Sequence, residues 1–444
     1  MTRAILPRSF AKDYPIAVRA EGARIWDSDG REFIDLSGSA AVNFIGFGIP
    51  EISDALDAQA RTLPFVHSSQ FTSEIAERFA AEVLHFAGSA FEGGAVFFTC
   101  GGSEAVETAL KLARQYQIES SHPERFEVIS RRQAYHGATL GALAVSGNLA
   151  RREAYLPMVR EFEHIAIPYC YRSEFSCDDC GHRSAEALRA AIDHSSGRAA
   201  AFIGEPMSGA TLGAVAPPSN YWPEIAAICR EHGLLLIADE VMTGFGRTGR
   251  NFCMEHWQVS PDILVCGKGI GSGYAPLGAV IATARVTDAI RRGSGSLIHG
   301  FTYNAHPVSM AAGSAVLAHI QRNKLVAAAD SAHGSIGARF ATALAKLQEI
   351  ETVGDVRGLG LLWGLEFVAD RATKQPFAPS EKFSARIAAA ALKRGVLTYP
   401  MQGSMDGRSG DHILLAPPAC EPALLLDAVS RLSDAIREAQ AARS

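Results

Sequence analysis

Two apolar runs in the middle of the chain, each ending in a charged residue, decide the fold. The first reads LLLIADEV over residues 234–241, and the second reads DILVCGKG over residues 262–269. Short, unbroken apolar runs are typical of strands that are buried on both faces of a parallel sheet. Similar runs lie at 95–98, 126–129 and 199–203, and helical stretches such as 102–116 and 221–232 separate several of them. This alternation predicts an α/β fold with a mostly parallel central sheet.

The two ends of the chain have a different pattern. A turn, WDSDG, lies within residues 25–36 and predicts a hairpin. After about residue 320 we expect long helices, and after them the strand-like stretch 353–368, a helix at 380–394, a strand at 412–415 and a closing helix at 422–442. We therefore expect a smaller α+β domain made of residues 1–60 and 319–444, beside a large domain of residues 61–318.

The overall composition excludes several classes of partner. The chain has 444 residues and a formal net charge of -5, and no basic block stands out, which argues against nucleic acid as a partner. The longest apolar runs are far too short to cross a bilayer, so no membrane partner is expected. Because residues 1–10 lack an apolar stretch of signal-peptide length, we expect a cytoplasmic protein.

The eight cysteines are scattered, and several sit inside apolar runs, so reduced core thiols are expected. One group is spaced more closely and consists of Cys170, Cys177, Cys180 and His182. This spacing could close a structural zinc site, but a Cys-rich surface insertion without metal explains it equally and is the simpler interpretation. We expect no metal in the main site.

Asp239 and Lys268 are the first candidates for chemistry. Each follows directly after one of the two apolar runs, and the carboxyl ends of strands in an open α/β sheet are where ligands bind. A lysine held between glycines at such a place can be desolvated, which lowers its pKa toward that of a nucleophilic free amine. Taken alone, each residue could also be an ordinary solvated loop charge.

Two strand-to-loop junctions add a possible anion site and a possible stacking site. The stretch FFTCGGSEA at 97–105 joins a strand to a helix through two glycines and a serine, and the free N–H groups there can hold a phosphate. An ordinary serine cap explains the same residues. Tyr135, beside His136, could stack on a flat cofactor, although this signal by itself is weak.

Six short motifs occur in order along the chain: GGSEA at 101–105, YHG at 135–137, EP at 205–206, DEV at 239–241, Lys268, and GFTY at 300–303. Taken together, they resemble one known family, the class III aminotransferases. These aminotransferases, which include the ω-aminotransferases, are fold type I enzymes that depend on pyridoxal phosphate. The resemblance extends from about residue 26 to the final helix, and six motifs in the right order and spacing are highly specific.

The resemblance implies roles for individual residues. Lys268 would carry the cofactor as a Schiff base and later shuttle a proton, and Asp239 would keep the pyridine nitrogen protonated. The remaining cofactor-binding residues that it implies are Gly102 and Ser103 at the phosphate, Tyr135 and Val241 on the two ring faces, His136, Glu205 at a polar edge, and Thr302. Because Thr302 would reach the phosphate of a neighbouring subunit, the resemblance implies a homodimer or higher oligomer with shared active sites.

Departures from the family pattern bear on the substrate. Ornithine-type members carry an arginine where this chain has Leu414, so those substrates are disfavoured. The ω-aminotransferases use an arginine from a loop slightly upstream, and Arg408 is the natural candidate for binding a substrate carboxylate; a solvated loop arginine is the alternative. Ala40 stands near the position of a pocket-wall tryptophan in some members, which suggests a roomier site.

The expected function is transamination by a ping-pong cycle. An amine or an ω- or β-amino acid would give its amino group to the cofactor, and a keto acid such as pyruvate would receive it. Lys268 alone can serve both halves as the proton shuttle, so no second acid–base pair is needed. A racemase or epimerase, an aminomutase or a decarboxylase would share the same residues, and a binding protein without turnover is a more distant alternative.

Overall fold

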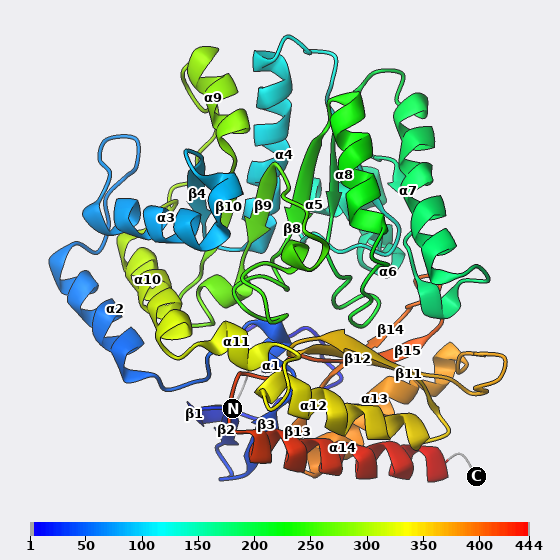
Figure 1. Cartoon of the computed structure of the whole chain (residues 1–444). Helices are drawn as coiled ribbons and strands as arrows, with labels where there is room; N and C mark the ends of the chain where they lie inside the picture. Colours follow the sequence, from blue (N-terminus) through cyan, green and yellow to red (C-terminus); the bar gives the residue numbers. More distant parts are fainter. Residues whose placement is uncertain (1–3, 443–444) are drawn as a thin grey trace.

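A seven-stranded sheet lies at the centre of the large domain in the computed structural model, which describes residues 4–442 (Figure 1). The strand order is β4-β10-β9-β8-β7-β5-β6. All neighbouring pairs from β9 to β6 are parallel, whereas β10 is antiparallel to both β4 and β9. The strands are β4 (Ala95–Thr99), β5 (Glu127–Arg131), β6 (His164–Ile165), β7 (Ala199–Gly204), β8 (Leu235–Asp239), β9 (Ile263–Cys266) and β10 (Gly278–Ala282). The prediction of a mostly parallel sheet is confirmed.

Both faces of this sheet are buried under helices, which explains the unbroken apolar runs of its strands. On one face, Ile237 of β8 shares an apolar cluster with Ala109 of α4 (Gly102–Glu119). On the other face, Leu236 belongs to the cluster of Trp222 from α8 (Tyr221–His232), which packs beside α7 (Cys177–His194). Successive strand residues point to opposite faces, so an apolar residue is needed at every position.

Further helices surround the sheet or connect its strands. They are α2 (Pro50–Thr62), α3 (Glu74–Ala87), α5 (Leu140–Val145), α6 (Leu149–Arg152), α9 (Ala284–Arg292) and α10 (Pro307–Arg322). Short 3-10 turns occur at Ser89–Phe91, Glu153–Met158, Cys170–Arg172, Cys253–Trp257 and Lys268–Ile270. In the described part of the chain, no helix is both long enough and apolar enough to span a membrane.

Both ends of the chain build the smaller domain, as predicted. The parallel pairing of Ile34 in β3 with Val396 in β13 joins the N-terminal strands to the C-terminal part. The first sheet contains β1 (Ala17–Glu21), β2 (Arg24–Asp27), β3 (Glu32–Asp35) and β13 (Val396–Leu397). The second contains β11 (Val353–Leu359), β12 (Leu362–Phe367), β15 (Asp411–Leu415) and β14 (Tyr399–Gln402). The expected hairpin near residues 25–36 is the β2–β3 pair.

The helices of the small domain differ from expectation in one respect. They are the short α1 (Gly38–Ala41), α11 (Leu325–Ala329), α12 (Ile336–Ala345), α13 (Phe383–Lys393) and α14 (Pro422–Ala441). Helices do follow residue 320, but they are shorter than expected, since α10 ends at Arg322 and Lys324, with a left-handed φ of 53°, precedes the separate α11. The boundaries at residues 60 and 318 stay predictions; α2, which contains residue 60, packs against α10 of the large domain.

Candidate functional site

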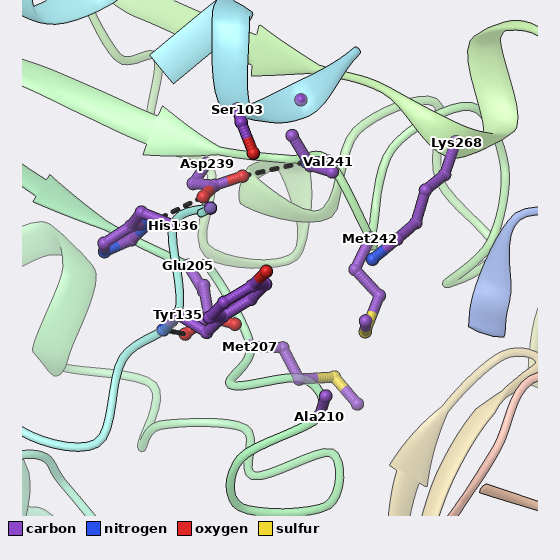
Figure 2. Close-up of a pocket in the computed structure, with 12 residues that line it drawn as sticks. Ser103, Tyr135, His136, Glu205, Met207, Ala210, Asp239, Val241, Met242 and Lys268 are labelled. Atoms are coloured by element: carbon purple, nitrogen blue, oxygen red, sulfur yellow. Dashed lines mark hydrogen bonds and ion pairs between the residues drawn. The ribbon is translucent and has the colours of Figure 1, made fainter. Parts of the chain in front are cut away.

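Asp239 and Lys268 open into the same pocket at the carboxyl edge of the central sheet (Figure 2). Asp239 is the last residue of β8 and pairs with Val265 of the neighbouring parallel strand β9. Lys268 comes two residues after the end of β9. Because the two strands are parallel neighbours, both side chains reach a single cavity of about 190 Å³. The structure therefore brings together the two residues that the sequence singled out first.

The position of Lys268 suits an amine nucleophile. Its backbone is in the left-handed region, with φ 45°, a conformation that is costly for a residue other than glycine and that clusters at functional sites. Burial lowers the pKa of its amine to about 8, although the charges of Asp239 and Glu205 partly oppose this effect. A larger share of the amine is therefore neutral, and nucleophilic, near neutral pH than for an exposed lysine.

The Asp239 carboxylate is held in place from two directions. Its Oδ2 lies 2.7 Å from Nδ1 of His136, and its Oδ1 accepts a hydrogen bond from the backbone N–H of Val241 at 3.1 Å. Both the carboxylate and the imidazole ring are buried. With its orientation fixed, the carboxylate keeps further lone pairs with which it can bind a protonated ring nitrogen.

The start of α4 forms an anion-binding corner of the pocket. Within residues 4–442, the backbone N–H groups of Gly102 and Ser103 have no acceptor, as is usual in the first turn of a helix. The Ser103 Oγ accepts a hydrogen bond from the backbone N–H of Ala138 at 3.1 Å, which fixes the hydroxyl beside these groups. Free N–H groups and the positive end of the helix dipole favour a phosphate at this corner.

Val241 and Tyr135 form two walls of the pocket. A methyl group added at Gly102 would lie only 2.9 Å from Cγ1 of Val241, so the isopropyl group packs directly on the start of the helix. Tyr135 follows β5, and its backbone N–H donates to Oε2 of Glu205 at 3.3 Å. In Figure 2 the Tyr135 ring and the Val241 side chain lie on different sides of the pocket, which gives room for a flat ring.

Glu205 lies directly after β7 and is buried at the same edge of the sheet. Its Oε1 accepts a hydrogen bond from the backbone N–H of Gly209 at 3.1 Å. Burial raises the pKa of its carboxyl group, the nearby Asp239 raises it further, and His136 opposes both effects. A carboxyl group of this kind can hold a proton at higher pH than an exposed glutamate, so it can serve as a donor at the polar edge of a ligand.

The family follows from comparison with known proteins. The model for the family described as aminotransferase class-III matches residues 9–432. The chain belongs to this family. YodT of Bacillus subtilis (strain 168), described as an uncharacterised aminotransferase, is 36% identical over 424 residues, which cover 94% of each chain.

Two solved structures show the same fold over nearly the full length. An (S)-enantioselective ω-transaminase from Thermomicrobium roseum has a TM-score of 0.90 and 34% identity, and the match covers 98% of this chain and 97% of that one. An amine transaminase from an uncultivated Pseudomonas species, solved with pyridoxal phosphate, has a TM-score of 0.89 and 33% identity, with coverage of 99% and 98%. The protein is a fold type I aminotransferase that depends on pyridoxal phosphate.

The pocket of the aminotransferase fits this cofactor by its own chemistry. The free N–H groups at Gly102 and Ser103 suit a phosphate, and Asp239 suits a protonated ring nitrogen. Among residues 4–442, the amine of Lys268 has no hydrogen-bond or ion-pair partner and is free to react with an aldehyde.

Three residues expected at the site of the aminotransferase lie outside the lining of this pocket. Arg408 is 70% exposed and forms an ion pair with Glu153 at 3.3 Å. Ala40 is exposed on the short α1 with a left-handed φ of 66°. Thr302 is exposed on the loop before α10. Their roles toward substrate, or toward a neighbouring subunit, stay predictions.

The structure also adds residues that the sequence analysis missed. Met207, Ala210 and Met242 line the pocket. Met207 follows the EP motif and Met242 follows the DEV motif directly, so their place next to functional residues was a usable signal. The guanidinium group of Arg151 lies over the Tyr135 ring, and no motif pointed to it.

The closely spaced cysteines of the aminotransferase do not form a recognisable metal site. The His182 ring turns to Glu224, with Nδ1 2.8 Å from Oε2. Across residues 4–442, no group of three or more His, Cys, Asp or Glu side chains is arranged to hold a metal ion, so the zinc hypothesis gains no geometric support. All eight cysteines are free thiols in the structure, but a place in the core holds for only four of them: Cys180, Cys229, Cys253 and Cys266 are buried, and Cys177 is exposed.

Proposed function

We propose that this aminotransferase moves an amino group from an amine, or from an ω- or β-amino acid, to a keto acid such as pyruvate by a ping-pong cycle. The observation that carries the proposal is the meeting of the Lys268 amine and the Asp239 carboxylate in one pocket. The two solved relatives described above are named as ω- and amine transaminases, which supports an amine donor.

Different residues of the pocket would contact different parts of the cofactor. Gly102 and Ser103 would hold the phosphate, Tyr135 and Val241 would cover the two ring faces, and Asp239 would bind the ring nitrogen. His136 orients the Asp239 carboxylate through their 2.7 Å contact. When bound, pyridoxal phosphate supplies an aldehyde that takes up the amino group and a cationic ring that absorbs the electrons released with the proton.

Lys268 performs the proton transfer in both halves of the cycle. Because its pKa is lowered to about 8, more of the amine is neutral near neutral pH and can accept a proton from the donor carbon and later return it. Glu205 stands within the same lining and would hold the polar edge of the cofactor. The methionines Met207 and Met242 give the substrate end an apolar, adaptable surface that suits hydrophobic amines.

A homodimer, or a higher oligomer, is the proposed active form. Thr302 is exposed, and its neighbour Tyr303 and the nearby Ile298 are apolar side chains that are 56% and 81% exposed. Burying these side chains against a second copy of the chain would be favourable and would let Thr302 reach the other copy's phosphate. Sedimentation measurements on wild-type protein and on Thr302→Ala test this: the variant should stay dimeric but retain less cofactor.

A panel of amine donors tests the proposed reaction. Each donor is added to the loaded protein without a keto acid, and the loss of the visible cofactor band is followed; pyruvate is then added and alanine is quantified. Restoration of the band with one alanine formed per donor consumed supports transamination. Racemised donor, or carbon dioxide release without alanine, would instead support a racemase or a decarboxylase and would overturn the proposal.

A further inference from the structure

Arg151 is a cation that lies next to the pocket lining without being part of it. It lies on α6, the helix after α5, and its guanidinium carbon is 4.4 Å from the centroid of the Tyr135 ring. Tyr135 itself lines the pocket. A guanidinium group at this distance over an aromatic face is held by a cation–π attraction, so its position beside the pocket is maintained without a salt bridge.

This guanidinium group has no carboxylate partner within residues 4–442. Its printed hydrogen-bond partner is the thioether sulfur of Met401 on β14, 3.8 Å from Nη2, and thioether sulfur is a weak acceptor. The nearby acid Glu153 is already paired with Arg408. Arg151 is half-buried, and a half-buried cation without a counter-charge has binding capacity left for an anion.

The pocket itself needs such a cation when a keto acid binds. Its lining contains two carboxylates, Asp239 and Glu205, and the amine of Lys268. Lys268 carries the cofactor and transfers the proton, so it is not available to hold a substrate carboxylate. The charge of Arg151 contributes a little to lowering the pKa of the Lys268 amine, in keeping with its place against Tyr135 of the pocket lining.

We propose that Arg151 binds the carboxylate of the keto-acid acceptor; this inference rests on the proposed transamination. On binding, Arg151 exchanges its contact with the Met401 sulfur for charge-assisted hydrogen bonds to the carboxylate and keeps the Tyr135 ring beneath it. An amine donor that has no carboxylate does not use the Arg151 guanidinium group. Arg151 therefore determines specificity for the acceptor and leaves the apolar donor contacts unchanged.

Arg408 is the rival candidate for binding the acceptor carboxylate, so the two arginines are compared directly. It lies in the 403–410 loop, and its ion pair with Glu153 is mostly exposed, so its removal costs little stability. Because that removal frees Glu153 to move toward Arg151, each Arg408→Met variant also carries Glu153→Gln. The two arginines also make opposite predictions. If the loop arginine binds the acceptor, Arg408→Met loses keto-acid turnover, whereas the position of Arg151 predicts that loss for Arg151→Met.

The experiment compares two acceptors that differ only in the carboxylate. The loaded protein is first converted with an uncharged amine, and kcat/KM is then measured for pyruvate and for acetaldehyde. For Arg151→Met we expect a drop of about 10- to 100-fold with pyruvate, the size typical of losing a hydrogen bond to a charged group, and a change of less than about twofold with acetaldehyde. Arg151→Lys should recover part of the loss, and Arg408→Met should lose little with either acceptor.

A second measurement follows binding without acceptor turnover. Propanoate should inhibit the amine half-reaction of the wild type more strongly than propanamide does, and Arg151→Met should remove that difference. Equal losses with both acceptors, or a pyruvate-specific loss only in Arg408→Met, would overturn the role of Arg151 while the amine half-reaction stays intact. Failure of wild-type protein to consume any amine would instead overturn the proposed function.

Discussion

Gly102 offers a sharp test of the pocket geometry, because a single methyl group added there acts on the wall formed by Val241. The new Cβ would lie 2.9 and 3.0 Å from Cγ1 and Cγ2 of Val241. Carbon atoms in favourable contact are about 3.5–4.0 Å apart, so the overlap is about half an ångström at each methyl. In Gly102→Ala, the valine must therefore move toward the space for the cofactor ring.

The magnitude follows from the cost of overpacking. Extra methyl groups in well-packed sites cost about 1–3 kcal/mol, which corresponds to a cofactor affinity about 5- to 150-fold weaker. Alanine is a better helix former than glycine by about 1 kcal/mol, so the helix itself is not weakened by the change. We expect Gly102→Ala to remain folded by circular dichroism but to lose pyridoxal phosphate on dialysis.

The neighbouring Gly101 supplies the control, because a Cβ added there meets no heavy atom within 4 Å. In equilibrium dialysis, Gly101→Ala should bind pyridoxal phosphate with the same dissociation constant as the wild-type protein. Val241→Ala, introduced into Gly102→Ala, should restore part of the lost affinity, because the contacting methyls are gone. The proposed contact between residue 102 and Val241 would be refuted if Gly102→Ala bound pyridoxal phosphate as tightly as the wild type. It would also be refuted if the affinity losses of the two single variants simply added in the double variant.

Three further outcomes follow from the same site. Since the pKa of the Lys268 amine is about 8, its neutral fraction rises about tenfold from pH 7 to pH 9. The rate at which cofactor-free protein binds pyridoxal phosphate should rise with that fraction. A rate that stays flat or falls over this pH range would contradict the role of the neutral amine. His136→Leu removes the side-chain partner of Asp239 and should lower kcat about tenfold or more, while the fold, followed by circular dichroism, is retained. Lys268→Ala should abolish the amine half-reaction, and normal turnover in that variant would remove its assigned role.

The central sheet was predictable because its strands are buried on both faces. Runs such as 234–238 and 263–266 must be apolar at every position, and that requirement leaves a clear pattern. The meeting of Asp239 and Lys268 follows from the same rule, since residues after neighbouring parallel strands share one edge. The antiparallel strand β10 was not predictable, because an apolar run carries no sign of its direction.

Contacts between distant segments left no local pattern. His136 and Asp239 are far apart in the sequence, and only the folded structure shows that the His136 ring contacts the Asp239 carboxylate. The same applies to the arginines. Arg408 was chosen from its place in a loop, but the position of its side chain depends on Glu153, and the place of Arg151 over Tyr135 depends on how α6 packs.

Borohydride reduction of the loaded protein tests the central claim most directly. Protein incubated with pyridoxal phosphate should absorb in the visible region and lose that band on reduction, and peptide mass spectrometry should then find the phosphopyridoxyl group on Lys268. His136→Leu should carry the same label, because its effect is on Asp239 and not on the amine. Protein that stays colourless, or a label found mainly on another lysine, would contradict the claim that Lys268 and Asp239 act together on one cofactor.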